Sequence, residues 1–262
     1  MATERLWVVV GAGLAIAITA TMDAHGLTMF SALPLLPLAG ALWYFQRFSR
    51  KQMGLAIGTP SGYAVALAFP VVVLSLDCAI AFVNGSTHAS VLTQTAMVHA
   101  LIGAVAGIIA VLLTEEGFFR GWLWAALGRA GLSNSATLAA SATLFALWHV
   151  SYATTAQGYI LPPGQVAIFI TNAFVMGVIW GVMRSISGSI IVSSVSHSAW
   201  NAFTYLLFGE GPKIGLLGIS QTALYGAEVG VIGLALNAAF AVTVLCVARH
   251  IIWGTRSISL LR

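Results

Sequence analysis

Residues 101–127 read LIGAVAGIIAVLLTEEGFFRGWLWAAL, and this stretch decides the fold class. It is longer than the roughly 20 apolar residues that a helix needs to cross the hydrocarbon of a bilayer. Its charged residues, Glu115, Glu116 and Arg120, are confined to one short segment. Because charge inside a membrane is expensive, the pattern predicts a transmembrane helix that carries a functional site.

The rest of the chain has the same character. Only 7% of its 262 residues are charged, whereas soluble domains carry about 25%. This excludes an ordinary soluble protein, and no alternation of polar and apolar residues suggests a transmembrane β-barrel. The basic residues are scattered singly, which argues against a nucleic-acid partner. Cys78 and Cys246 lie in apolar segments without metal-ligand spacing.

We therefore predict an all-α, polytopic membrane bundle with about eight transmembrane helices and the lipid bilayer as its environment. No repeat or linker divides residues 1–262, so they are expected to form a single integral membrane domain. Arg5 precedes the first apolar run, which leaves a cleaved signal peptide as an alternative there. The expected spans are residues 6–22, 27–45, 63–83, 101–127, 137–153, 166–183, 190–208 and 229–247.

The basic residues also predict the orientation, since they favour the cytoplasmic side of a membrane. With the N-terminus inside, only Lys213 lies outside, and eight spans bring both termini to the cytoplasm. The abundance of Arg, Ala and Gly suggests a bacterial source. The expected location is therefore the cytoplasmic membrane of a bacterium. The residues placed inside are Arg5, Arg47, Arg50, Lys51, Arg129, Arg184, Arg249, Arg256 and Arg262.

Pairs of glycines four residues apart allow helix backbones to approach closely in lipid. Such pairs occur at Gly103/Gly107, Gly177/Gly181 and Gly226/Gly230.

Three spans carry polar residues at helical spacing. Glu116 and Arg120 are four residues apart and can pair, while Glu115 points about 100° away from Glu116. Phe145 lies one turn before His149 and can wall an apolar pocket beside the imidazole.

His197 and Asn201 also share a helix face. Counted at about 1.5 Å per residue, Glu115 and His149 each lie roughly 18 Å, and His197 roughly 16 Å, from the cytoplasmic ends of their helices. The three sites can therefore meet, provided that residues 121–127 belong to the bundle.

Structural roles remain open for each motif. The pair Glu116 and Arg120 could staple helices, and His149, His197 and Asn201 could be interhelical hydrogen bonders. Their common depth in a chain nearly empty of charge favours a functional site. Asp77 and Glu228 are weaker candidates, and His25, His88, His99 and His250 fall at span ends or in loops.

The chemistry open to such a cluster is hydrolysis. Burial and neighbouring charges shift the pKa of a carboxylate, so that it can act as a general base and activate water. His197 and Asn201 could then stabilise an oxyanion. Alternatively, Glu115, His149 and His197 form a plausible three-ligand zinc set with an open position for water.

The motifs E-E-x-x-x-R, F-x-x-x-H and H-x-x-x-N resemble those of the CAAX protease and bacteriocin-processing (CPBP, or ABI) family of glutamate-type intramembrane proteases. They are matched in order between about residues 109 and 208, and we take about 101–208 as the catalytic core. The resemblance implies that Glu115 activates water with the help of His149, while His197 and Asn201 form the oxyanion hole. Glu116, Arg120 and Phe145 would support this site. Some names used in the family include the word metalloprotease, so a zinc ion remains an alternative and we do not assign a cofactor.

The expected function is an intramembrane endopeptidase that cuts a membrane protein or a leader peptide, with access from the cytoplasm or laterally between helices. The chain lacks H-E-x-x-H, the rhomboid-like G-x-S-G and the G-x-G-D aspartate motif. A proton-coupled transporter, or a non-catalytic partner such as an immunity protein, is the alternative use of the same polar cluster.

Overall fold

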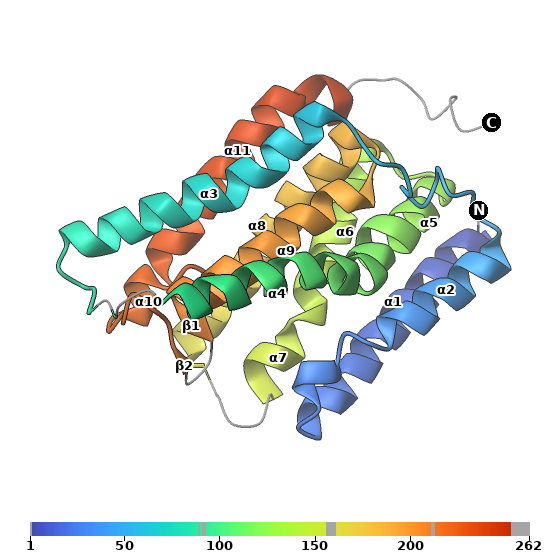
Figure 1. The fold of residues 1–262 in the computed structure, drawn as a ribbon. Coiled ribbons are helices and arrows are strands. Elements are labelled where there is room, and N and C mark those ends of the chain that lie inside the picture. The colour runs from blue at the N-terminus through green and yellow to red at the C-terminus, as the bar shows by residue number, and fades with distance from the viewer. Residues whose placement is uncertain (1, 89, 91–92, 156–160, 211–212, 253–262) are drawn as a thin grey trace.

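The computed structural model describes residues 2–88, 90, 93–155, 161–210 and 213–252. These residues form a helical bundle, as predicted, and each of the eight expected spans falls on helix (Figure 1). Arg256 and Arg262 lie outside the described residues. The helices are α1 (Ala2–Ala24), η1 (Thr28–Phe30), α2 (Leu35–Gln46), α3 (Pro60–Val83), α4 (Gln94–Leu113), η2 (Gly117–Leu123), α5 (Trp124–Arg129), α6 (Asn134–Trp148), α7 (Val150–Thr155), α8 (Pro163–Ser187), α9 (Ile190–Leu207), α10 (Thr222–Tyr225) and α11 (Val231–Ile252). Strands β1 (Gly209–Glu210) and β2 (Lys213–Ile214) pair antiparallel.

Six helical segments of the described chain are long and apolar enough to cross a membrane, fewer than the eight that we predicted. The expected spans that fail this criterion are α6 with α7, and α9. Helices α6 and α7, which flank His149, are short, whereas polar residues such as His197 and Asn201 lower the mean hydropathy of α9. The six are Ala2–Ala24, Thr28–Gln46, Pro60–Val83, Gln94–Arg129, Pro163–Ser187 and Val231–His250.

Helix α9 lies inside the bundle, where it packs against α3, α4 and α8. In Figure 1, α3 and α11 run side by side on one flank, and α1 and α2 form the other. Large apolar side chains point away from the bundle on the outer helices, among them Val9, Ile102 and Val247, which are each at least 60% exposed. Apolar side chains facing outward and polar ones facing inward are what a lipid environment requires.

Several helices meet at one end of the molecule, which we call the basic end and define by Arg47, Arg50, Lys51, Arg129 and Arg184. Contacts join these segments, because Arg129 Nη1 donates to Gln46 O at 2.6 Å and Arg184 Nη2 donates to Gln52 O at 3.0 Å. The start of α1 lies there too, since Gln46 Nε2 donates to Glu4 Oε2 at 3.1 Å. The clustering agrees with the distribution of charge expected of one membrane face.

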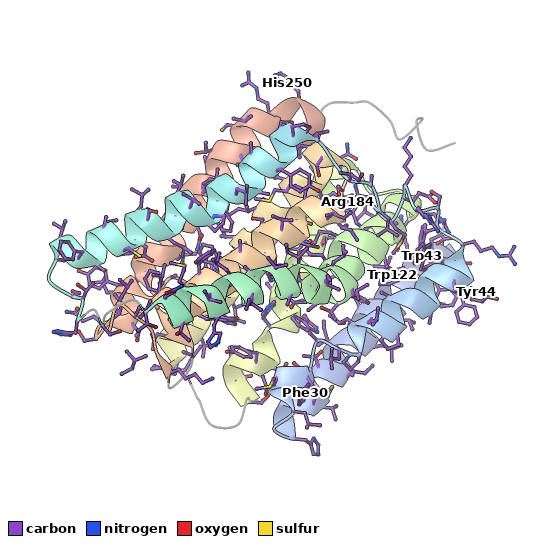
Figure 2. The ribbon with its side chains drawn as sticks, in the orientation of Figure 1. Phe30, Trp43, Tyr44, Trp122, Arg184 and His250 are labelled. Atoms are coloured by element: carbon purple, nitrogen blue, oxygen red, sulfur yellow. The ribbon has the colours of Figure 1, made fainter. Side chains whose placement is uncertain are left out.

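Helix η2 packs against α2 through the side chain of a buried tryptophan. Trp122 is fully buried and donates from Nε1 to Gln46 Oε1 at 2.5 Å. Tyr44 of the same helix is 78% exposed and points outward, as Figure 2 shows. Residues 121–127 therefore belong to the bundle, the condition on which the predicted common depth of the polar motifs depends.

One of the three glycine pairs holds two helices in close contact. A Cβ at Gly177 of α8 would lie 3.0 Å from the Cα of Ala142 of α6, and one at Gly181 would meet Leu138. Gly103 instead has no atom within 4 Å of such a Cβ, and Gly226 and Gly230 approach each other within one turn. The prediction of close helix contact thus holds at Gly177 and Gly181, and also at Gly107 of α4, where a Cβ would collide with Ser198 Oγ of α9.

We expect Gly177→Val to lower the free energy of unfolding by about 1–3 kcal/mol, because the new side chain would collide with the α6 backbone. Gly103→Val is the matched control, since its side chain would enter open space. Unfolding of both variants by sodium dodecyl sulfate in mixed micelles measures the difference. Equal stability of the two would show that α6 and α8 can separate without cost.

Candidate active site

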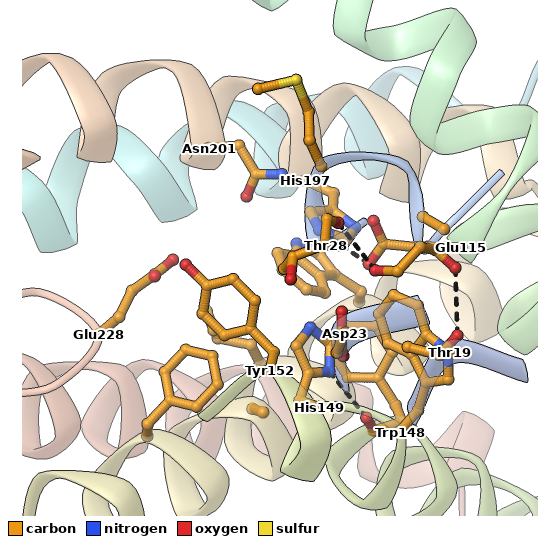
Figure 3. Close-up of a pocket in the computed structure, with 18 of the residues that line it drawn as sticks. Thr19, Asp23, Thr28, Glu115, Trp148, His149, Tyr152, His197, Asn201 and Glu228 are labelled. Carbon is orange, nitrogen blue, oxygen red and sulfur yellow. Dashed lines mark hydrogen bonds and ion pairs between the residues drawn. The ribbon is translucent and has the colours of Figure 1, made fainter. Parts of the chain in front are cut away.

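A cavity of about 280 Å³ is lined by residues of α1, η1, α6, α7, α8 and α9 and by Glu115, which lies between α4 and η2 (Figure 3). Glu115, His149, His197 and Asn201 all line it, so three motifs that are far apart in the chain come together. Its other lining residues are Thr19, Asp23, Thr28, Met29, Ser31, Ala32, Phe145, Trp148, Tyr152, Phe169, Ala173, Met176, Trp180, Tyr205 and Glu228.

The two glutamates are positioned by a break in the helix. Helix α4 ends at Leu113, and the next residue, Thr114, has φ and ψ of −104° and −93°, outside the helical region. The chain then resumes as η2, a π-helical turn. Gly117 permits this path, because a Cβ there would lie 2.7 Å from the carbonyl oxygen of Leu112. Such π-helical turns frequently occur at functional sites, and here the break replaces the continuous helix that we predicted.

Glu116 and Arg120 form the predicted pair. Arg120 Nη1 lies 3.0 Å from Glu116 Oε1, and both side chains are fully buried. Arg120 Nη2 also donates to the carbonyl oxygen of Gly177 at 3.2 Å, and its guanidinium lies 4.3 Å from the ring centre of Phe145. The arginine therefore connects η2 to α6 and α8.

His197 is held between the two glutamates. Its Nδ1 lies 3.1 Å from Glu116 Oε1, and its Nε2 lies 3.8 Å from Glu115 Oε2. Its ring stacks on that of Trp180, with centres 3.8 Å apart and planes 15° apart. Because Nδ1 binds Glu116, Nε2 is directed toward Glu115 and the cavity. Glu116 thus orients His197 as well as neutralising Arg120, a role that spacing alone did not suggest.

His149 ends α6 instead of continuing it. Its Nδ1 lies 2.8 Å from the carbonyl oxygen of Phe145, which leaves Nε2 for the cavity. The rings of Phe145 and His149 meet edge to face at 4.4 Å, so Phe145 does wall the imidazole as expected. The predicted span 137–153 is consequently split into α6 and α7 at the histidine itself.

Asn201 lies one turn after His197 on α9 and lines the same cavity (Figure 3). Glu115 and Asn201 are both partly exposed to the cavity, unlike Glu116 and Arg120. A reacting group in the cavity would therefore meet a carboxylate, two imidazoles and an amide, while the ion pair stays behind them.

Two further carboxylates line the cavity and were missed or ranked low from the sequence. Asp23 lies in the last turn of α1, just beyond the expected span, and its Oδ2 accepts a hydrogen bond from Ser151 Oγ at 2.6 Å. Glu228 precedes α11 and accepts from Trp200 Nε1 at 2.8 Å. Each is an ionisable residue at the end of an apolar span, which was the available signal.

Asp77 does not line this cavity. It is fully buried in α3, and neither carboxylate oxygen has a hydrogen-bond partner among the described residues. We expect Asp77→Val to raise the free energy of unfolding by about 1–3 kcal/mol, because it removes an unsatisfied polar group from the interior.

Asp77→Asn is the control, since an amide of the same shape leaves the unsatisfied position polar. Thermal unfolding in detergent compares both variants with the wild type. A destabilised Asp77→Val protein would instead indicate that the carboxylate has a partner or a role of its own.

The residues do not fit the predicted zinc set. Among the described residues, no group of three His, Cys, Asp or Glu side chains is arranged so that it could hold a metal ion. His197 Nδ1 is already bound to Glu116 and His149 Nδ1 to a carbonyl oxygen, so each imidazole has one nitrogen for the cavity.

The chemistry that the arrangement allows is general-base activation of water. A carboxylate and an imidazole nitrogen that face one small cavity can bind a water molecule between them and accept its proton. Hydrogen-bond donors on the opposite helix can stabilise the negative charge that develops on a carbonyl oxygen.

Comparison with known proteins agrees with this geometry. Residues 94–203 match a protein family described as "Rce1-like: Type II CAAX prenyl endopeptidase Rce1-like". The match includes all seven motif residues named from the sequence and extends from the start of α4 to α9. No curated protein matches the chain significantly. Over residues 94–203 this integral membrane protein therefore matches the Rce1-like family, in agreement with the resemblance that its three motifs carry.

Proposed function

We propose that this protein is an intramembrane endopeptidase that hydrolyses a peptide bond with water activated by Glu115. The observation that carries the proposal is the convergence of Glu115, His149, His197 and Asn201 on one cavity within a bundle otherwise poor in charge. The description of the matching family, a type II CAAX prenyl endopeptidase, supports the same reaction class.

In this mechanism, a water molecule binds between Glu115 and His149. Its oxygen forms a bond to the scissile carbonyl carbon as its proton passes to the Glu115 carboxylate. The carbonyl oxygen becomes an oxyanion and accepts hydrogen bonds from the Asn201 amide and His197 Nε2–H. The C–N bond then breaks, and Glu115 returns the proton to the leaving amine.

Glu116 and Arg120 have a supporting role in this scheme. Glu116 Oε1 lies 3.1 Å from His197 Nδ1, which turns the opposite ring nitrogen, Nε2, toward Glu115 and the cavity, where the oxyanion would form. Arg120 fixes the Glu116 carboxylate, so the pair determines where the donor of His197 points.

The cavity lies toward the end of the bundle opposite the basic end. Asp23 is at the far end of α1 from Glu4, and Glu228 is at the far end of α11 from Arg249. If the basic end faces the cytoplasm, as the charge distribution predicts, substrates reach the site from the outer face or laterally between helices. Access from the cytoplasm, our other expectation, would require the opposite orientation.

The test is a comparison of membrane and secreted peptides from cells that produce the wild type, Glu115→Gln or His149→Ala at equal levels. Proteolysis predicts that a set of peptides appears only with the wild type. Identical peptide sets from all three would contradict it, and loss of a proton-driven uptake in the variants would favour the transporter.

A further inference from the structure

Asp23 is a carboxylate for which the proposed chemistry has no use. It is completely buried, and it lines the cavity from the side of α1 (Figure 3). Its Oδ2 is bound by Ser151, whereas its Oδ1 is buried without a hydrogen-bond partner among the described residues. Leaving a buried carboxylate oxygen unbound costs stability, so proteins keep few such groups and often use them at binding sites.

A second polar atom accompanies it. Thr28 follows the turn after α1 and lines the same cavity, and its Oγ1 is also buried without a partner in the described part of the chain. Asp23 Oδ1 can only accept when the group is ionised, while the Thr28 hydroxyl can accept or donate. On this side of the cavity, Asp23 and Thr28 therefore offer two hydrogen-bond acceptors to a bound ligand.

The charge of the cavity favours one kind of donor. Its described lining contains three carboxylates, those of Asp23, Glu115 and Glu228, and neither Lys nor Arg. Arg120 lies behind the wall and is paired with Glu116. In a site of low dielectric, this arrangement attracts a cation and repels a carboxylate.

We propose that Asp23 binds substrate, and that its Oδ1 accepts a hydrogen bond from a protonated amine on the peptide. The amine belongs either to a lysine side chain or to a free amino terminus. The inference rests on the proposed protease function only in that the bound group is part of the segment to be cut. It implies that a segment ending in a free carboxylate close to the cavity is a poor ligand.

A purely structural role for Asp23 makes a different prediction. Ser151 lies two residues after His149, so the bond between Ser151 and Asp23 ties α1 to α7 and could position the histidine. Asp23→Asn keeps a carbonyl oxygen for Ser151 Oγ but replaces the free oxygen by a donor. Ser151→Ala removes the tie and keeps the charge. The two variants therefore separate recognition from positioning.

The experiment titrates the purified full chain in neutral detergent and follows tryptophan fluorescence, because Trp148 and Trp180 line the cavity. The four probes share a dodecyl or dodecanoyl chain. They are dodecanoyl-Gly-Lys-amide, norleucine dodecylamide with a free α-amine, dodecanoyl-Gly-norleucine-amide without charge, and the corresponding free acid.

We expect the wild type to bind one of the two amine probes about tenfold more tightly than the uncharged probe, and the acid least tightly, as is typical of a charge-assisted hydrogen bond. Asp23→Asn should remove this preference, while Ser151→Ala should retain it. Which amine probe is preferred distinguishes a lysine side chain from an amino terminus.

Glu228→Gln is the matched control for general electrostatic attraction, because it removes another carboxylate of the same cavity. An equal loss in Glu228→Gln and Asp23→Asn would overturn the proposal, as would an unchanged preference in Asp23→Asn. Binding is also measured in Glu115→Gln, which cannot cleave. An amine preference that depends on Asp23, together with identical peptide sets from wild-type and Glu115→Gln cells, would refute the protease and leave the amine site standing.

Discussion

Replacing Glu115 by Gln is expected to lower kcat for peptide hydrolysis by about 10³-fold, because an amide cannot accept the proton of the attacking water. The loss should appear in kcat with little change in KM, since Glu115 acts on water rather than on the bound segment. Purified protein in nanodiscs, assayed with a peptide identified from cells, gives both constants. Asn201→Ala should lower kcat by about 10²-fold or more through loss of an oxyanion donor.

Glu4→Gln is the control for the loss of a carboxylate. Glu4 lies at the basic end and binds Gln46, far along α1 from the cavity, so its replacement should leave kcat unchanged. Hydrolysis by Glu115→Gln at the wild-type rate, with the protein correctly folded, would remove Glu115 from the mechanism.

Replacing Arg120 by Met should be the most destabilising of these changes, at about 3–5 kcal/mol. It leaves the Glu116 carboxylate buried without its cation, and it removes the hydrogen bond to Gly177. Unfolding by sodium dodecyl sulfate in mixed micelles measures the loss. The stability of Arg120→Lys should fall between those of the wild type and Arg120→Met, because lysine keeps the positive charge but lacks the planar fork with which arginine binds both acceptors.

The double variant Arg120→Met/Glu116→Gln provides the internal check. It removes the unpaired charge while keeping an oxygen that can accept from His197 Nδ1, so much of the lost stability should return. The single and double variants form a cycle that gives the coupling energy of the pair. Additive losses would show that Glu116 and Arg120 act independently despite their separation of 3.0 Å.

Much of the fold follows from local sequence. The apolar runs predict where helices form because, in lipid, each backbone N–H and C=O must be satisfied within its own segment. Glu116 and Arg120 pair as their spacing predicts, since residues four apart meet on a helix whatever surrounds it. The motif residues share a depth because their distances from the helix ends are set by the helical rise.

Other features depend on contacts between segments. The break at Thr114 and the π-helical turn after it are stabilised by the surroundings of η2, and periodicity does not predict them. Fewer described helices reach the length and hydropathy expected of a span because α6 and α9 are covered by other helices and need not be apolar throughout. Asp23 and Glu228, from opposite ends of the chain, face one cavity only because α1 packs against α6 and α7 while Trp200 of α9 binds Glu228.

Hydropathy and helical spacing are local properties, so the amino-acid sequence is enough to identify this chain as a helical membrane protein with an ordered set of Glu, His and His/Asn motifs. The packing of the helices, in contrast, places His197 between Glu115 and Glu116, ends α6 at His149, and turns toward the cavity an Asp23 oxygen that no described residue binds. These relations join residues far apart in the chain, and they depend on how helices rotate and pack against one another.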